Sequence, residues 1–132
     1  HVGLNDLSLA LGLKFMFELL ASDLVANLVY QFKSENIPFG IGGVAKFGEG
    51  IASSELVLSE HARLGSTGVI LSRSFHEYSN TIEELNSRID FKDELNKLTE
   101  CYYRFSTQCE EDLLKNKRLL EKQIYNFIDT KS

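Results

Sequence analysis

Glycine and proline are confined to the first part of this chain. All nine glycines and the single proline lie before residue 76, and helix formers and charged residues dominate the rest of the 132 residues. Because glycine and proline interrupt helices and favour turns, the first part is expected to contain short elements joined by turns. The second part is expected to be helical. We therefore divide the chain into residues 1–76 and residues 77–132.

The first region alternates between apolar runs typical of strands and stretches with a helical pattern. Strands are expected at 1–4, 37–41 and 67–71, and helices at 23–36 and 53–64. The apolar runs are continuous, whereas a strand with one face in water would alternate apolar and polar residues. Continuous strands joined by helices predict an α/β fold with a parallel sheet covered on both faces.

The second region contains two sequence signatures of a helix start. Thr81-x-x-Glu84 and Thr107-x-x-Glu110 are capping boxes, in which the Thr side chain is expected to cap the helix that follows. The apolar residues after each box recur at helical spacing. We expect these helices to pack on the first region, on each other or on a neighbouring subunit, as the oligomerisation arm of a homo-oligomer.

Composition and charge exclude several classes of function. A net charge of −5 and an isoelectric point near 5.2 argue against a surface for nucleic acid or an anionic membrane, which needs clustered Lys and Arg. No apolar run approaches the roughly 20 residues of a membrane span, and the first residues lack a secretory signal pattern. Cys101 and Cys109 fit reduced thiols in a cytoplasmic protein. The only Met is Met16, so we expect more chain before residue 1 in the natural protein.

Polar residues and glycines follow each of the three expected strands. The first strand end presents Asn5, Asp6 and Ser8, the second presents Gly40–Gly43, and the third presents Ser72–Ser74. In parallel α/β folds, ligands collect at the carboxyl ends of the strands, where helix N-termini attract anions. Asp6 is placed either to bind a hard cation such as Mg²⁺ or to cap the following helix, and both interpretations stay open.

The stretch GLNDLSLALG at residues 3–12 resembles a strand motif of the phosphoenolpyruvate/pyruvate superfamily of TIM barrels. Two branches are closest: the metal-dependent pyruvate aldolases with their citrate-lyase β-subunit relatives, and the phosphoenolpyruvate-utilising phosphotransfer enzymes. The resemblance implies that residues 1–76 are about three C-terminal βα units of a (βα)8 barrel, followed by a helical extension. It also implies that Asp6 binds Mg²⁺ or Mn²⁺ with a second protein ligand outside this chain, and that Asn5 and Ser8 bind the substrate.

The residues after the second expected strand separate these two branches. The phosphotransfer branch has Cys-Gly-Glu at this strand end, whereas this chain has Gly42-Gly43-Val44 and lacks the thiol that would donate a proton. We therefore favour a carbon–carbon lyase or aldolase that acts on a keto acid such as pyruvate, or on an acyl relative. The motif departs from the aldolase branch at Leu4, where that branch usually has Pro.

Two alternatives stay open. The Gly40–Gly43 and Ser72–Ser74 loops are similar to the paired phosphate sites of phosphate-binding TIM barrels. In such a site the amides of Gly42 and Gly43 would hold a phosphate, and Arg73 would pair with a carboxylate or phosphate. Glycines after a buried strand are also required for tight turns in any fold. The other alternative is a non-catalytic assembly module.

Two histidines receive less weight. His61 lies in an expected helix between Glu60 and Ala62, and we expect it at the surface or at an interface. His76 ends an expected strand near the ligand face, where it is either a general acid or base or a solvated loop residue.

Overall fold

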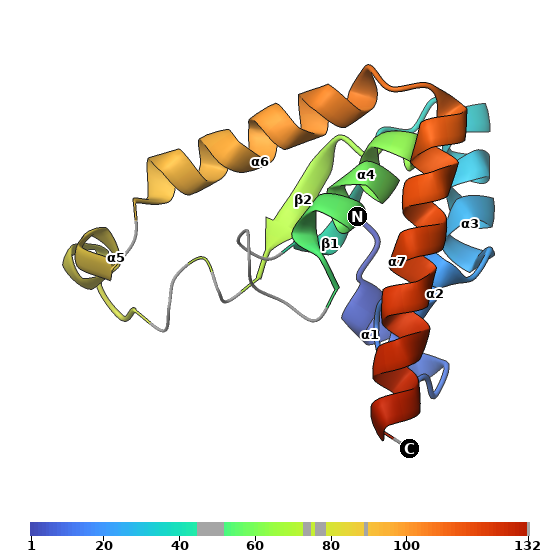
Figure 1. Cartoon of the computed structure of the whole chain (residues 1–132), viewed down its shortest axis with the longest axis horizontal. Helices are drawn as coiled ribbons and strands as arrows, with labels where there is room; N and C mark the ends of the chain where they lie inside the picture. The colour runs from blue at the N-terminus through green and yellow to red at the C-terminus, as the bar shows by residue number, and fades with distance from the viewer. Residues whose placement is uncertain (45–51, 73–74, 76–78, 89, 132) are drawn as a thin grey trace.

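The computed structural model describes residues 1–44, 52–72, 75, 79–88 and 90–131. Within these residues the chain forms helices and two strands in the following order (Figure 1): α1 Leu4–Ala10, α2 Glu18–Ala21, α3 Leu24–Ser34, β1 Gly40–Val44, α4 Ser54–Leu64, β2 Gly68–Leu71, α5 Ile82–Arg88, α6 Phe91–Ser106 and α7 Glu110–Lys131.

The two strands form a parallel sheet with close backbone contact at its start. Gly40 pairs with Gly68 and Ile41 pairs with Val69, and the register shifts after Gly42. A Cβ atom on Gly40 would lie 2.7 Å from the Gly68 carbonyl oxygen, so only glycine fits this crossing. On the other edge of β1, Val2 makes a single parallel bridge to Ile41.

The prediction of three βα units of a (βα)8 barrel is wrong. The described residues are mainly helical, and their sheet has only the two short strands β1 and β2. The strand expected at 1–4 is reduced to the bridge at Val2, because the amide of Leu7 donates to the Gly3 carbonyl and helix α1 already begins at Leu4. The strand expected at 37–41 begins later, since Pro38 has no N–H for a strand ladder.

Helix α4 lies at the centre of the core. Helices α6 and α7 both pack on α4, and α7 also packs on α2. Figure 1 shows α7 running beside α2, whereas α6 extends away toward α5. Buried apolar side chains fill the space between these elements and the sheet, among them Ile41, Val44, Val57, Leu120 and Ile124. The region after residue 77 therefore packs on the first region, and its role as an oligomerisation arm stays a prediction.

The predicted helix ends are only partly correct. Thr81 caps α5 as expected, since the amide of Glu84 donates to its Oγ1 at 3.1 Å. Thr107 instead ends α6, because its hydroxyl donates to the Arg104 carbonyl at 2.8 Å. Gly65 ends α4 in the left-handed conformation with φ +82°, as its sequence position indicates.

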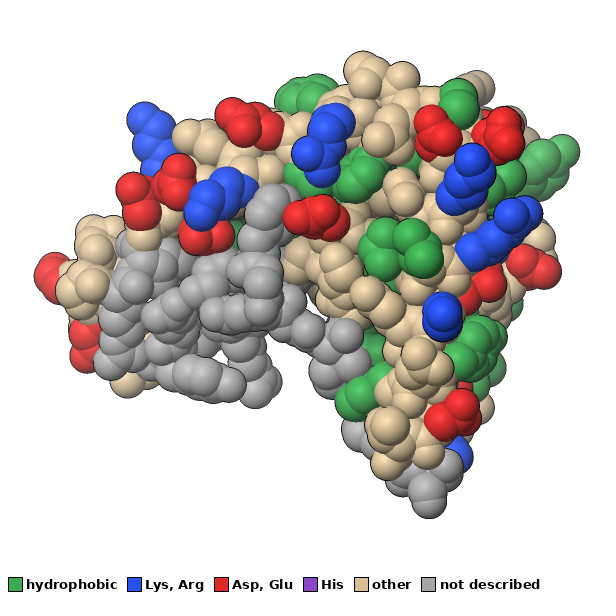
Figure 2. Space-filling model, in the orientation of Figure 1, with side chains coloured by type: hydrophobic (Ala, Val, Ile, Leu, Met, Phe, Trp, Pro, Cys, Tyr) green, Lys and Arg blue, Asp and Glu red, His purple; other side chains and the backbone are tan. Residues whose placement is uncertain are grey.

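The surface carries charges of both signs. Figure 2 shows Lys and Arg side chains interspersed with Asp and Glu on one face of the molecule. Along α6, for example, Lys97 lies 3.2 Å from Asp93 and 3.4 Å from Glu94. Among the described residues, no helix combines the length and the apolar composition that crossing a membrane requires.

Candidate functional site at the strand ends

A cavity of about 360 Å³ lies where α1 begins and where β1 and β2 end. Its polar lining residues are His1, Asn5, Asp6 and Ser72, its apolar lining residues are Leu4, Met16, Ile70 and Leu71, and three glycines complete it, Gly3, Gly42 and Gly43. Residues far apart in sequence therefore meet at one edge of the parallel sheet. This is the edge where α/β proteins bind ligands.

Two of these glycines leave room for polar side chains. A Cβ atom on Gly3 would lie 3.4 Å from Oδ2 of Asp6, and one on Gly42 would lie 3.2 Å from Nε2 of His1. The carboxylate and the imidazole thus lie directly over backbone that has no side chain. Glycine at these positions keeps the space beside both groups open.

Gly43 is required for two reasons. Its φ of +95° lies in the region that disfavours residues with a Cβ atom. A Cβ atom there would also lie 2.6 Å from Cε of Met16. The thioether of Met16 therefore occupies the space that any larger residue at position 43 would fill.

The structure brings together most of the predicted site residues that it describes. Asn5, Asp6, Gly42 and Gly43 all line the cavity. Ser8 does not line it: this side chain is buried and its hydroxyl donates to the Asn5 carbonyl at 2.8 Å. Ser8 therefore contacts the backbone that carries Asn5. Whether any of these residues binds a substrate stays a prediction.

Two parts of the predicted site lie outside the described residues. One part is Arg73 with Ser74, and the other is His76. Ser72 is described, and it lines the cavity.

Some cavity residues were absent from the sequence prediction. His1 had a weak signal, because side chains alternate along an extended segment and the neighbouring Val2 is apolar. Met16 had none, since it lies in the irregular segment between α1 and α2. Ile70 was expected in a strand, but which face of that strand meets the cavity depends on the pairing with β1.

The donor set fits a hard cation. Asp6 is not the N-cap of α1, because Gly3 holds that position and no side chain caps it. Asp6 is exposed and lines the cavity together with Asn5 and Ser72, whose side chains also contain oxygen atoms. Among the described residues no three His, Cys, Asp or Glu side chains cluster as a metal site. A single carboxylate fits Mg²⁺, which commonly uses one or two carboxylates and completes its shell with water and substrate.

The backbone amides argue against a phosphate cradle at the described strand ends. The amide of Gly42 donates to the Val2 carbonyl at 3.3 Å, and the amide of Ser72 donates to the Val44 carbonyl at 2.8 Å. A phosphate site needs amides that point to the ligand. These two amides are already used by the sheet.

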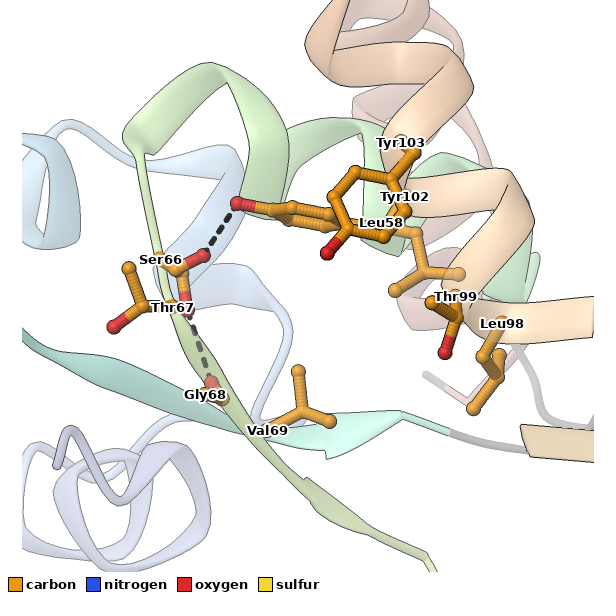
Figure 3. A pocket seen from close by; sticks show the side chains of 9 residues that line it. All are labelled: Leu58, Ser66, Thr67, Gly68, Val69, Leu98, Thr99, Tyr102 and Tyr103. Carbon is orange, nitrogen blue, oxygen red and sulfur yellow. Dashed lines mark hydrogen bonds between the residues drawn. The ribbon is translucent and has the colours of Figure 1, made fainter. Parts of the chain in front are cut away.

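A second cavity, of about 250 Å³, lies near the start of β2 between α4 and α6 (Figure 3). None of its lining residues is charged. Tyr102 donates its hydroxyl to the Ser66 carbonyl at 2.7 Å, and the Ser66 hydroxyl donates to the Gly68 carbonyl at 3.0 Å. Burial raises the pKa of Tyr102. Since these hydroxyl groups already stabilise the fold, we place the candidate site at the strand ends.

Comparison of the chain with protein-family models, with curated proteins and with solved structures found no match. Any functional assignment therefore depends on the residues and the geometry of the chain itself.

Proposed function

We propose that the cavity at the strand ends belongs to a divalent-metal-dependent carbon–carbon lyase or aldolase that acts on a keto acid such as pyruvate. One observation carries the proposal. Asn5 and Asp6 belong to one predicted segment of the site and Gly42 and Gly43 to another, and all four line the same cavity. The resemblance of residues 3–12 to the pyruvate aldolase motif is the reason for proposing a lyase or aldolase reaction.

Each residue has a defined role in this proposal. Asp6 would bind Mg²⁺ or Mn²⁺, and the cation would polarise the keto oxygen of the substrate. Asn5 would hold the substrate carboxylate, and Ser8 would keep Asn5 in position. His1 also lines the cavity, and imidazole is a side chain that enzymes often use for proton transfer.

Two further predictions belong to the proposal. Cys101 and Cys109 are both free thiols, which supports a cytoplasmic location. Helices α6 and α7 would form the contact between subunits of a homo-oligomer, and sedimentation of the chain tests this.

The metal site is tested with Mn²⁺, whose unpaired electrons broaden the NMR signals of nearby amides. In the wild-type chain we expect selective broadening at Asn5, Gly42 and Ser72. Asp6→Asn removes the charge with little change in shape and should abolish this pattern. Glu35→Gln is the matched control, because Glu35 is an exposed acid at the end of α3, away from the cavity lining.

The same samples test the substrate. With Mg²⁺ present, pyruvate should shift the amide signals of Asn5 and Gly42, and removal of Mg²⁺ with a chelator should weaken that binding. Broadening that persists in Asp6→Asn would remove Asp6 from the metal site. Pyruvate that binds nowhere near the cavity would contradict the proposed function.

A further inference from the structure

We infer that the substrate of this site is a keto acid with an apolar chain longer than the methyl group of pyruvate. The inference rests on the proposed function and concerns the part of the cavity that the proposed chemistry does not use. The lining includes four apolar side chains, those of Leu4, Met16, Ile70 and Leu71. The cavity therefore offers polar groups to a carboxylate and keto group, and it also offers apolar surface to a hydrocarbon chain.

The size of the cavity supports a longer substrate. A volume of about 360 Å³ lies in the range of roughly 300–1,000 Å³ that is typical of sites for larger organic ligands. A three-carbon acid has one methyl group to offer to the apolar wall. The remaining apolar surface would stay in contact with water, which is unfavourable.

Met16 and Ile70 are positioned to select the chain. The Cε atom of Met16 lies over Gly43, and a thioether adapts its shape to different hydrocarbon chains. Ile70 lies on β2 with 58% of its surface exposed, so it has apolar area available for a ligand. Its neighbour Val69 is 39% exposed and lines the cavity between α4 and α6 instead.

The test measures dissociation constants of pyruvate, 2-oxobutanoate, 2-oxopentanoate and 2-oxohexanoate by NMR titration with Mg²⁺. Burying one methylene group contributes about 0.8 kcal/mol, so each added carbon should tighten binding about fourfold. Ile70→Thr should reduce the gain per carbon. Val69→Thr is the matched control on the same strand and should retain the full gain.

Each outcome has one meaning. Equal affinities along the series, with pyruvate still bound, overturn the apolar-chain inference and leave the proposed function standing. Equal losses in Ile70→Thr and Val69→Thr also overturn it, because the effect would not be local to the cavity. If none of the acids binds, the proposed function fails and this inference fails with it.

Discussion

The Nδ1 atom of His61 lies 3.1 Å from the Ser66 hydroxyl oxygen inside the core, and Nε2 of the same ring has no hydrogen-bond partner in the described part of the chain. His61 is fully buried, although its charged neighbour Glu60 had indicated the surface or an interface. Burial lowers the pKa of His61 to about 4. The ring is therefore neutral at physiological pH, and protonating it would place a charge in the core.

This burial predicts that the protein loses stability in mild acid. The folded pKa of about 4 lies below the ordinary value of 6.5, so the unfolded chain binds the proton more tightly. The contribution of His61 is fully present above pH 6.5 and is lost as the pH falls toward 4. Between pH 7.5 and 5 the free energy of unfolding should fall by about 2 kcal/mol from this group, as measured by urea denaturation.

Two variants identify the responsible histidine. His61→Leu should remove most of this pH dependence, whatever its effect on stability at pH 7.5. His1→Asn should retain the dependence, because His1 is exposed. A pH profile that is unchanged in His61→Leu would show that another group causes the acid sensitivity.

The sequence predicted the ends of helices better than it predicted which segments pair as strands. The end of α4 at Gly65 and the start of α5 at Thr81 depend on nearby residues, and both were correct. The first strand was wrong because Val2 and Leu4 are apolar in either a strand or a helix, and only long-range pairing decides between them. The burial of His61 likewise depends on tertiary packing, since α4 lies under both α6 and α7 from the far end of the chain.

Part of the candidate site could be predicted from the sequence for a similar reason. Val2 and Ile41 form a parallel bridge; Asn5 and Asp6 follow Val2, and Gly42 and Gly43 follow Ile41, so all four could be expected to meet at one edge of the sheet. Met16 lies in an irregular segment, where no periodic pattern indicates which direction a side chain takes.

Gly43→Ala should both destabilise the protein and obstruct the cavity. Alanine is strained at a φ of +95°, and its Cβ atom would lie 2.6 Å from Cε of Met16, so the Met16 side chain would have to move. We expect a loss of about 2 kcal/mol in unfolding free energy. Keto-acid affinity should fall by at least about tenfold, the equivalent of 1.4 kcal/mol.

Gly12→Ala separates backbone strain from obstruction. Gly12 also has a positive φ, of +71°, but no atom lies within 4 Å of the position where its Cβ would be. This variant should lose about 1 kcal/mol of stability and keep its affinity for the ligand. If both variants bind equally well, the space beside Gly43 is unrelated to binding.

The ion pair between the buried Glu60 and the partly buried Arg63 should be essential for stability. Arg63 contacts Glu60 through two nitrogens. Its Nη2 donates to Oε2 of Glu60 at 3.0 Å, and its Nε donates to Oε1. The hydrogen bond to Glu60 raises the pKa of Arg63. Arg63→Gln leaves a buried carboxylate without its cation and should cost about 3 kcal/mol by thermal or urea unfolding.

A second substitution checks the cause of that loss. Glu60→Gln combined with Arg63→Gln removes both charges, so part of the stability should return. A double variant that is less stable than Arg63→Gln would mean that the uncompensated carboxylate is not the reason.

Ser8→Ala distinguishes a residue that positions the site from one that contacts substrate. The Ser8 hydroxyl is buried and bonds the Asn5 carbonyl, so its removal should cost about 1 kcal/mol of stability. Ser34→Ala is the matched control, because the Ser34 hydroxyl makes the same type of bond to the Gln31 carbonyl at 2.8 Å in α3. We expect Asn5→Ala to weaken keto-acid binding by about tenfold and Ser8→Ala by only a few fold, since a neutral hydrogen bond contributes about 1 kcal/mol. NMR titration measures both, and a loss in Ser8→Ala as large as that in Asn5→Ala would return Ser8 to the group of residues that touch the substrate.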